Sequence, residues 1–203
     1  MGEIFNFKLR VDEDFQKKSE AFITWFKAQP GTQFHPNLKI VDLRHRNAGR
    51  GIVATAPIEP DTDIFTIPRS IVITTENSSL FRKHPSIFDC LSEVEGIEDE
   101  NLDWFALVLT LIYEHFTGNA SPWKPYLDVL PSTFQTLMFW SDDELEELQG
   151  SSVRQKIGKA DADLMFQTKL LPFLNQNQNI FFTGTHSKPK DEELLALAHR
   201  MSM

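Results

Sequence analysis

The sequence predicts an α+β fold, in which a small antiparallel β unit is followed by a larger helical region. Two patterns carry this prediction. Between Leu38 and Ile73 the chain consists of short β-branched runs separated by turn residues, which is typical of antiparallel strands. After Thr75 the apolar residues recur every three or four positions, which is typical of helices. With 41% hydrophobic and 24% charged residues, the chain is expected to be ordered.

One helix and several strands are expected in the N-terminal third. Residues 12–28 predict a helix, because their apolar side chains fall on one face and Pro30-Gly31 follows as a stop signal. The β-branched runs predict strands over 38–41, 52–54, 64–67 and 70–73. The turn residues between them are Asn47-Ala48-Gly49 and Pro60-Asp61.

The rest of the chain is expected to be largely helical. Residues 102–117 carry an apolar stripe, and Gly118 is the expected stop. A capping box at Ser141 and Glu144 starts a short helix that is expected to end at Gly150. A longer helix is expected from Val153 to Leu171, ending near Pro172.

Two further segments complete this region. The polar tract from Asn175 to Asn179 is expected to be a loop. Residues 191–203 predict an amphipathic helix without a stop signal. A helix cut at this point leaves its last carbonyls free and its apolar face without a later partner. Such a helix is typical either of a truncated chain or of a fraying C-terminus.

The charge and cysteine content exclude some classes of protein. The net charge of -9 argues against a direct nucleic-acid partner, which would require a basic surface. It favours either solubility alone or attraction of a basic protein. The single cysteine, Cys90, excludes an internal disulfide and favours the nucleus or cytoplasm. Its apolar neighbours predict that Cys90 is buried.

The candidate binding segment is the turn around Gly49 and Gly51, which flank Arg50 between two predicted strands. Glycine permits positive φ angles and lets the backbone approach a flat ligand closely. Two interpretations of the short motif therefore stand side by side. It is either a simple hairpin turn or a turn whose backbone N–H and C=O groups contact a cofactor.

The longer context resembles a known family. The run from Gly49-Arg50-Gly51 through Ala56-Pro57-Ile58 to Ile67-Pro68-Arg69 is similar to the first β unit of the SET domain. Further motifs of the same branch follow in order: Ser121-Pro122-Trp123-Lys124-Pro125-Tyr126, Leu130-Pro131, Phe139-Trp140, Leu148-Gln149-Gly150 and Leu171-Pro172-Phe173. This branch includes the Rubisco large-subunit methyltransferase and the fungal ribosomal-protein lysine methyltransferases. The resemblance extends from about Ser19 onward.

The resemblance implies a division of the chain into three parts. They are a helical lead-in over residues 1–35, the N-terminal SET β unit over 36–75 and a helical SET insertion over 76–203. It also implies S-adenosylmethionine as cofactor, contacted by Ala48, Gly49 and Arg50 largely through the backbone. Trp123 is expected near the substrate, with a core tryptophan as the alternative. Arg69 is expected to anchor the fold through hydrogen bonds.

The SET enzymes that the chain resembles use an Asn-His pair and a tyrosine, both located late in their sequences. The chain contains neither. No asparagine precedes a histidine, and the only tyrosines are Tyr113 and Tyr126. We therefore expect that the catalytic half and the substrate-binding domain are absent, and we assign no catalytic residue. The histidines show no zinc-ligand spacing with Cys90, so no metal site is expected.

The function implied is that of a protein-lysine N-methyltransferase acting on a basic protein, with ribosomal proteins as the expected substrates. The chain itself is expected to be an inactive portion of such an enzyme, with no membrane partner. Two alternatives remain open. One is a non-catalytic protein-binding module derived from a SET protein, and the other is a relative that methylates histidine.

Overall fold

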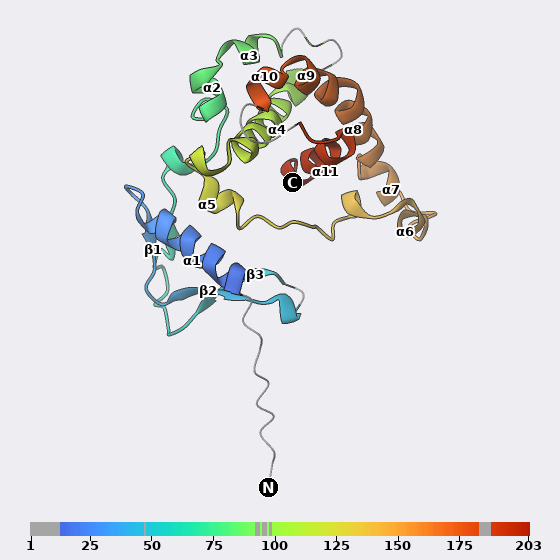
Figure 1. Ribbon diagram of the computed structural model, residues 1–203. Coiled ribbons are helices and arrows are strands. Elements are labelled where there is room, and N and C mark those ends of the chain that lie inside the picture. The colour runs from blue at the N-terminus through green and yellow to red at the C-terminus, as the bar shows by residue number, and fades with distance from the viewer. Residues whose placement is uncertain (1–12, 47, 92–93, 95–96, 98, 183–187) are drawn as a thin grey trace. The chain divides into compact units, whose positions relative to one another are not determined.

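The computed structural model (Figure 1) describes residues 13–46, 48–91, 94, 97, 99–182 and 188–203. It confirms the α+β class, because two small antiparallel sheets accompany many helices. The chain forms two compact units. The N-terminal unit comprises Met1–Val72 and Pro125–Leu130, and the helical unit comprises Ile73–Lys124 and Pro131–Met203. The three-part division at residues 35 and 75 stays a prediction.

The N-terminal unit combines one long helix with two-stranded sheets. Its elements are α1 (Glu13–Lys27), β1 (Gln33–Phe34), β2 (Leu38–Asp42), η1 (Arg44–Arg46), β3 (Arg50–Ala54), β4 (Phe65–Thr66) and η2 (Arg69–Ile71). The strands pair antiparallel as β1 with β4 and β2 with β3, the latter from Leu38 opposite Ala54 to Asp42 opposite Arg50. Phe26 of α1 is buried and meets Phe34 of β1 edge to face at 6.3 Å.

One strand was predicted wrongly in this unit. Residues 70–73 were expected to be extended, whereas Arg69–Ile71 form a 3-10 turn. The ring of Pro68 fixes its φ at -68°, and the Pro68 carbonyl accepts a hydrogen bond from the Ile71 N–H at 3.1 Å. These local hydrogen bonds replace those that a strand would make with a neighbour.

The helical unit is built around one central helix. Its elements are α2 (Ser79–Lys83), α3 (Ser86–Asp89), α4 (Asp99–Thr117), η3 (Gly118–Ala120), η4 (Leu137–Phe139), α6 (Asp142–Glu146), α7 (Val153–Lys156), α8 (Lys159–Met165), the π-helix η5 (Phe166–Leu170), α9 (Leu171–Gln176), α10 (Gln178–Phe181) and α11 (Asp191–Met201). The short helix α5 (Lys124–Leu127) includes residues assigned to both units. Helix α4 contacts α2, α10 and α11. Phe105, Leu109 and Ile112 of α4 are fully buried and form the centre of the core.

The predicted capping box at Ser141 and the predicted helix stop at Gly118 are confirmed. The Ser141 hydroxyl accepts from the Glu144 N–H at 3.3 Å, and the Glu144 carboxylate accepts from the Ser141 N–H at 2.8 Å. These hydrogen bonds to Ser141 lower the pKa of the Glu144 carboxyl group. Gly118 directly follows α4 and has a φ of 58°, the left-handed conformation that ends helices. Gly150 has a φ of 80°, but α6 already ends at Glu146 and not at Gly150.

The helix predicted from Val153 to Leu171 is interrupted instead of continuous. Gly158 adopts a φ of 72° between α7 and α8. Leu164 was expected on the buried apolar stripe of this helix, but it is 61% exposed. Pro172 does not end the helix, because it lies in the first turn of α9, where the missing N–H has no intrahelical acceptor. The π turn of η5 immediately before α9 already interrupts the regular hydrogen-bond pattern.

The loop expected over residues 175–179 is also wrong. Asn175 and Gln176 end α9, and α10 begins at Gln178, so only Asn177 lies between the two helices. Buried Leu174 and Phe181 hold the segment on both sides, so their packing overrides the low helix propensity of asparagine.

The apolar face of α11 packs on elements that precede it in the chain. Leu194, Leu197, Ala198 and Met201 are buried, and the helix contacts α4, η5 and α9. Cys90 is another correction, because it is exposed at the end of α3 while its neighbours Ile87 and Leu91 enter the core.

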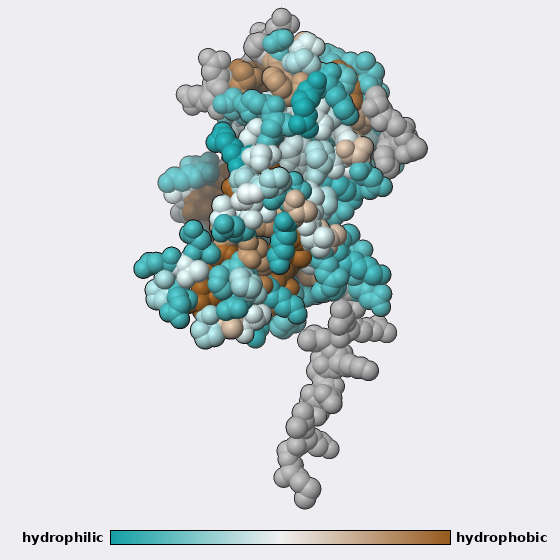
Figure 2. All heavy atoms as spheres, turned by 90° about the vertical axis from the view of Figure 1, so that its left-hand side faces the viewer, coloured by the Kyte–Doolittle hydropathy of each residue, from teal (hydrophilic) through white to brown (hydrophobic). Residues whose placement is uncertain are grey.

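The N-terminal unit carries several exposed apolar side chains. Ile52, Ile64, Phe65, Ile67 and Val72 are each at least 43% exposed. Hydrophobic residues interrupt the hydrophilic surface on the face drawn in Figure 2. Among the described residues, no helix is both long and apolar enough to cross a membrane.

Candidate functional site

The candidate site is the connection between β2 and β3, Leu43–Gly49, which we call the glycine turn. Three backbone hydrogen bonds meet at Leu43. Its N–H donates to the Gly49 carbonyl at 2.7 Å, and its carbonyl accepts from Arg46 at 2.8 Å and from Ala48 at 3.1 Å. Asn47, part of the predicted motif, lies outside the described residues. The turn is therefore closed mainly through one residue.

The two glycines of the motif have different roles. Gly49 adopts a φ of 60°, and beyond Gly49 and its two chain neighbours no atom is found within 4 Å of the position that a Cβ would occupy. Gly51 lies in β3, and a Cβ there would lie 2.3 Å from the Leu43 Cδ1. Gly49 therefore opens one face of the turn, whereas Gly51 leaves room for the Leu43 side chain. Only Gly49 has the positive φ that its sequence context suggested.

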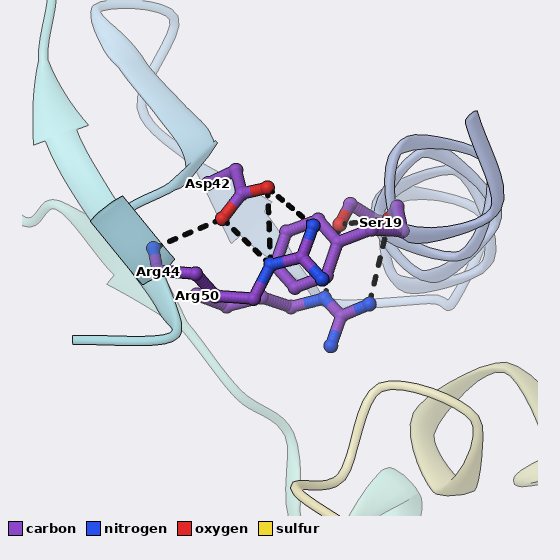
Figure 3. Close-up of polar contacts among 5 residues, drawn as sticks. Ser19, Asp42, Arg44 and Arg50 are labelled. Atoms are coloured by element: carbon purple, nitrogen blue, oxygen red, sulfur yellow. Dashed lines mark hydrogen bonds and ion pairs between the residues drawn. The ribbon is translucent and has the colours of Figure 1, made fainter. Parts of the chain in front are cut away.

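The side chain of Arg50 is engaged inside the N-terminal unit. Its Nε donates to the Ser19 Oγ at 3.0 Å (Figure 3). Its Nη1 donates to the Val129 carbonyl at 3.0 Å. Its guanidinium carbon also lies 3.8 Å from the centre of the Phe15 ring. Arg50 can therefore offer a ligand its backbone, as predicted, while its side chain holds β3 to α1.

Arg44, at the other end of the turn, makes an ion pair with Asp42. Its Nη2 lies 2.6 Å from the Asp42 Oδ2, and its Nε donates to the Oδ1 at 3.0 Å (Figure 3). The Arg44 backbone N–H also donates to the Oδ1. These hydrogen bonds from the Arg44 side chain and backbone lower the pKa of Asp42 from 3.8 to about 2.

The Asp42 carboxyl group is expected to titrate near pH 2, which NMR of its side-chain carbonyl carbon would measure. Because the pKa is lower in the folded chain, the interaction is fully present above about pH 4 and disappears as the pH falls through about 2. The Arg44→Gln variant is expected to return the midpoint toward 3.8. An unchanged midpoint in that variant would show that Arg44 does not cause the shift.

Three of the predicted site residues lie together, and one lies elsewhere. Ala48, Gly49 and Arg50 are consecutive at the end of the glycine turn. Trp123 belongs to the helical unit and is 4% exposed, as a core tryptophan would be. Arg69 is exposed, and its carbonyl accepts a hydrogen bond from the Val72 N–H at 3.2 Å. Its anchoring role stays a prediction.

Sequence reasoning missed the residues that support the turn. Phe15 was assigned to the apolar face of a helix, and nothing in its spacing indicated that two arginines contact its ring. Asp42 and Arg44 did carry a local signal, because an acid and a base two residues apart flank the turn. No group of three or more side chains that could hold a metal ion is found among the described residues.

The fold and the turn define the class of protein. No family model matches the chain. Two solved structures share its fold, the SET domain of LSMT bound to lysine and AdoHcy, with a TM-score of 0.63, and Rubisco LSMT bound to AdoMet, with a TM-score of 0.58. Each is 22% identical to the chain. The match to the first covers 89% of the chain and 37% of that structure, and the match to the second covers 88% of the chain and 38% of that structure. These structures show that the chain shares the SET-domain fold. Its curated homologues are SET-domain lysine methyltransferases.

Individual relatives define the branch. Ribosomal lysine N-methyltransferase 4 of Saccharomyces cerevisiae is 35% identical over 158 residues, which cover 76% of the chain and 31% of the relative. N-lysine methyltransferase SETD6 of Rattus norvegicus is 27% identical over 181 residues, covering 87% and 36%. The actin-histidine N-methyltransferase of Drosophila melanogaster is 28% identical over 141 residues, covering 70% and 23%. The chain thus spans about a third of the length of the first two relatives.

Proposed function

We propose that the chain provides the cofactor-binding turn of an S-adenosylmethionine-dependent protein-lysine N-methyltransferase. The observation that carries this proposal is the conformation of Gly49, which leaves one face of the glycine turn open to a ligand. Homology to enzymes of this class supports the identity of the ligand. The bound cofactor supplies the methyl group, carried on a sulfonium sulfur.

The residues present fit such a ligand through their backbone. Ala48 is exposed, and the Gly49 N–H and the Ala48 carbonyl take part in no backbone hydrogen bond among the described residues. The side chain of Arg50 is held by Ser19 and Val129, so it is not the group that contacts the cofactor. Ala48, Gly49 and Arg50 are therefore proposed to bind and orient the cofactor through main-chain groups.

The acceptor is proposed to be a lysine of a basic protein, with a ribosomal protein as the first candidate. A lysine must lose its proton before it attacks, and an apolar environment lowers its pKa because burial disfavours the charged form. The net charge of -9 would attract a basic partner. The relative named for histidine methylation of actin makes histidine the second candidate acceptor.

Trp123 is proposed to support the substrate side indirectly. Its side chain is buried, so it would shape the neighbouring surface without direct contact. The chain contains no Asn-His pair, and we propose that these 203 residues alone transfer no methyl group. The nucleus or cytoplasm is the proposed location, on the basis of the single cysteine.

Gly49→Asp is expected to abolish binding of S-adenosylhomocysteine, measured by calorimetric titration. The new side chain would occupy the open face of the turn, whereas aspartate tolerates a positive φ, so the fold should persist. Gly150→Asp is the matched control, because Gly150 also has a positive φ and open space around it but lies in the helical unit.

The control variant is expected to bind as the wild type does. Equal binding by Gly49→Asp and the wild type would contradict the proposed position of the cofactor. An absence of binding by the wild-type chain would contradict the proposed cofactor function and favour the non-catalytic binding module.

A further inference from the structure

The ring of Phe15, on α1, is contacted by the arginines at both ends of the glycine turn. The guanidinium carbon of Arg44 lies 4.0 Å from the ring centre, and that of Arg50 lies 3.8 Å from it. Arg44 follows β2 closely and Arg50 begins β3, so the two contacts fall on either side of the turn. We call Phe15, Arg44 and Arg50 the Phe15 cluster.

Each arginine of the cluster is also held by a second partner. Asp42 holds Arg44 through an ion pair and hydrogen bonds, which leave the guanidinium in one orientation. The Ser19 hydroxyl and the Val129 carbonyl hold Arg50. Ser19 itself is 4% exposed and donates to the Phe15 carbonyl at 2.8 Å. These partners hold the two guanidinium groups in place beside the ring. Because the arginine side chains are already ordered, they lose less conformational entropy when they contact the ring.

The contacts to Phe15 add to the backbone hydrogen bonds found among the described residues of the turn. Its hydrogen bonds converge on Leu43, and Gly49 has the conformational freedom of a glycine. A cation over an aromatic face is attracted to the π electrons, and this attraction does not require a hydrogen bond from the turn itself. The Phe15 ring, which both arginines contact, thus joins the start and the end of the turn to helix α1.

We propose that Phe15 is a positioning residue, which holds the glycine turn in the conformation that admits S-adenosylmethionine. The inference rests on the proposed function of the turn. Phe15 acts through Arg44 and Arg50 and does not itself touch the cofactor. Its contribution is to keep the binding conformation populated, because an apparent affinity falls with the fraction of molecules that are competent to bind.

The test compares Phe15→Leu with Phe15→Tyr in the full chain. Leucine keeps an apolar side chain but removes the aromatic face, whereas tyrosine keeps that face. Phe15→Leu is expected to raise the hydrogen-exchange rates of the Leu43 and Ala48 amides about tenfold, as expected for the loss of two cation–π contacts of ordinary strength. It is also expected to weaken binding of S-adenosylhomocysteine several-fold, and Phe15→Tyr is expected to restore both properties.

Phe22→Leu is the matched control. Phe22 lies on the same helix, but its ring contacts are to Trp25, Phe26 and Tyr126. This variant is expected to leave exchange at Leu43 and Ala48 unchanged. If it accelerates exchange as much as Phe15→Leu does, the effect is a general loosening of α1 and the inference is overturned.

Two failures can be told apart. Unchanged exchange at Leu43 and Ala48 in Phe15→Leu overturns the positioning role alone. A wild-type chain that binds no S-adenosylhomocysteine overturns the proposed function, and the purpose assigned to Phe15 with it. If Phe15→Leu does not fold, Arg44→Gln provides the same test, because Arg44 is exposed and its loss removes one of the two contacts.

Discussion

Phe166→Ala is expected to lower the free energy of unfolding by about 3–5 kcal/mol, the range for removing a buried aromatic side chain. Phe166 is fully buried in the π-helix η5. Its ring stacks on Trp104 of α4 at 5.6 Å and meets His199 of α11 edge to face at 4.8 Å. Loss of the ring removes both contacts and leaves a cavity between the three elements. Urea denaturation followed by circular dichroism would measure the change.

Leu164→Ala is the control for this variant. Leu164 lies two residues earlier along the same helical segment, and it is 61% exposed. Its replacement is expected to change the stability by about 0.5 kcal/mol or less. Comparable losses in the two variants would show that burial does not determine the contribution of Phe166, because alanine raises the helix propensity at both positions.

Glu114→Ala is expected to cost roughly 3 kcal/mol or more, because it leaves two buried donors without an acceptor. Glu114 lies on α4 and is fully buried. One carboxyl oxygen accepts from the Ser79 N–H at 2.7 Å, and the other accepts from the Ser121 hydroxyl at 2.6 Å. The Ser121 oxygen in turn accepts from the Trp123 N–H at 3.2 Å. One side chain thus connects the start of α2, α4 and the segment leading to Trp123.

Thermal and urea unfolding would measure the effect of Glu114→Ala. Glu147→Ala, at an exposed glutamate of the same unit, provides the control and is expected to be nearly neutral. A loss below about 1 kcal/mol for Glu114→Ala would contradict the structural role of the buried carboxyl group, since a single ordinary hydrogen bond contributes that much.

The parts of the fold that could be predicted from the sequence depend on neighbouring residues. The capping box at Ser141 and the helix stop at Gly118 are set by residues within a few positions of each other, so their patterns are visible in the sequence. The helical course past Pro172 and the packing of α11 depend on distant partners. Phe166 and Leu174 are buried, and the elements that carry them, η5 and α9, contact α11. The local sequence pattern does not identify these contacts.

The candidate site also combines a part set by neighbouring residues with a part set by residues far apart in the sequence. The glycine turn was found because Gly49 and its neighbours form a contiguous motif. Its support was not found, because Arg50 reaches Ser19, 31 residues away, and Val129, 79 residues away. Hydrogen bonds of this kind are formed by the tertiary fold, and they leave no periodic signal in one sequence.

The close approach of Leu43 to Gly51 has an evolutionary consequence. The two residues share one volume, since a Cβ at position 51 would lie 2.3 Å from the leucine methyl group. A larger residue at 51 would be accepted most readily in lineages where residue 43 had already become smaller, because overpacking a filled site is destabilising. The pair is therefore expected to evolve together, with mutation at one position deciding which substitutions the other tolerates.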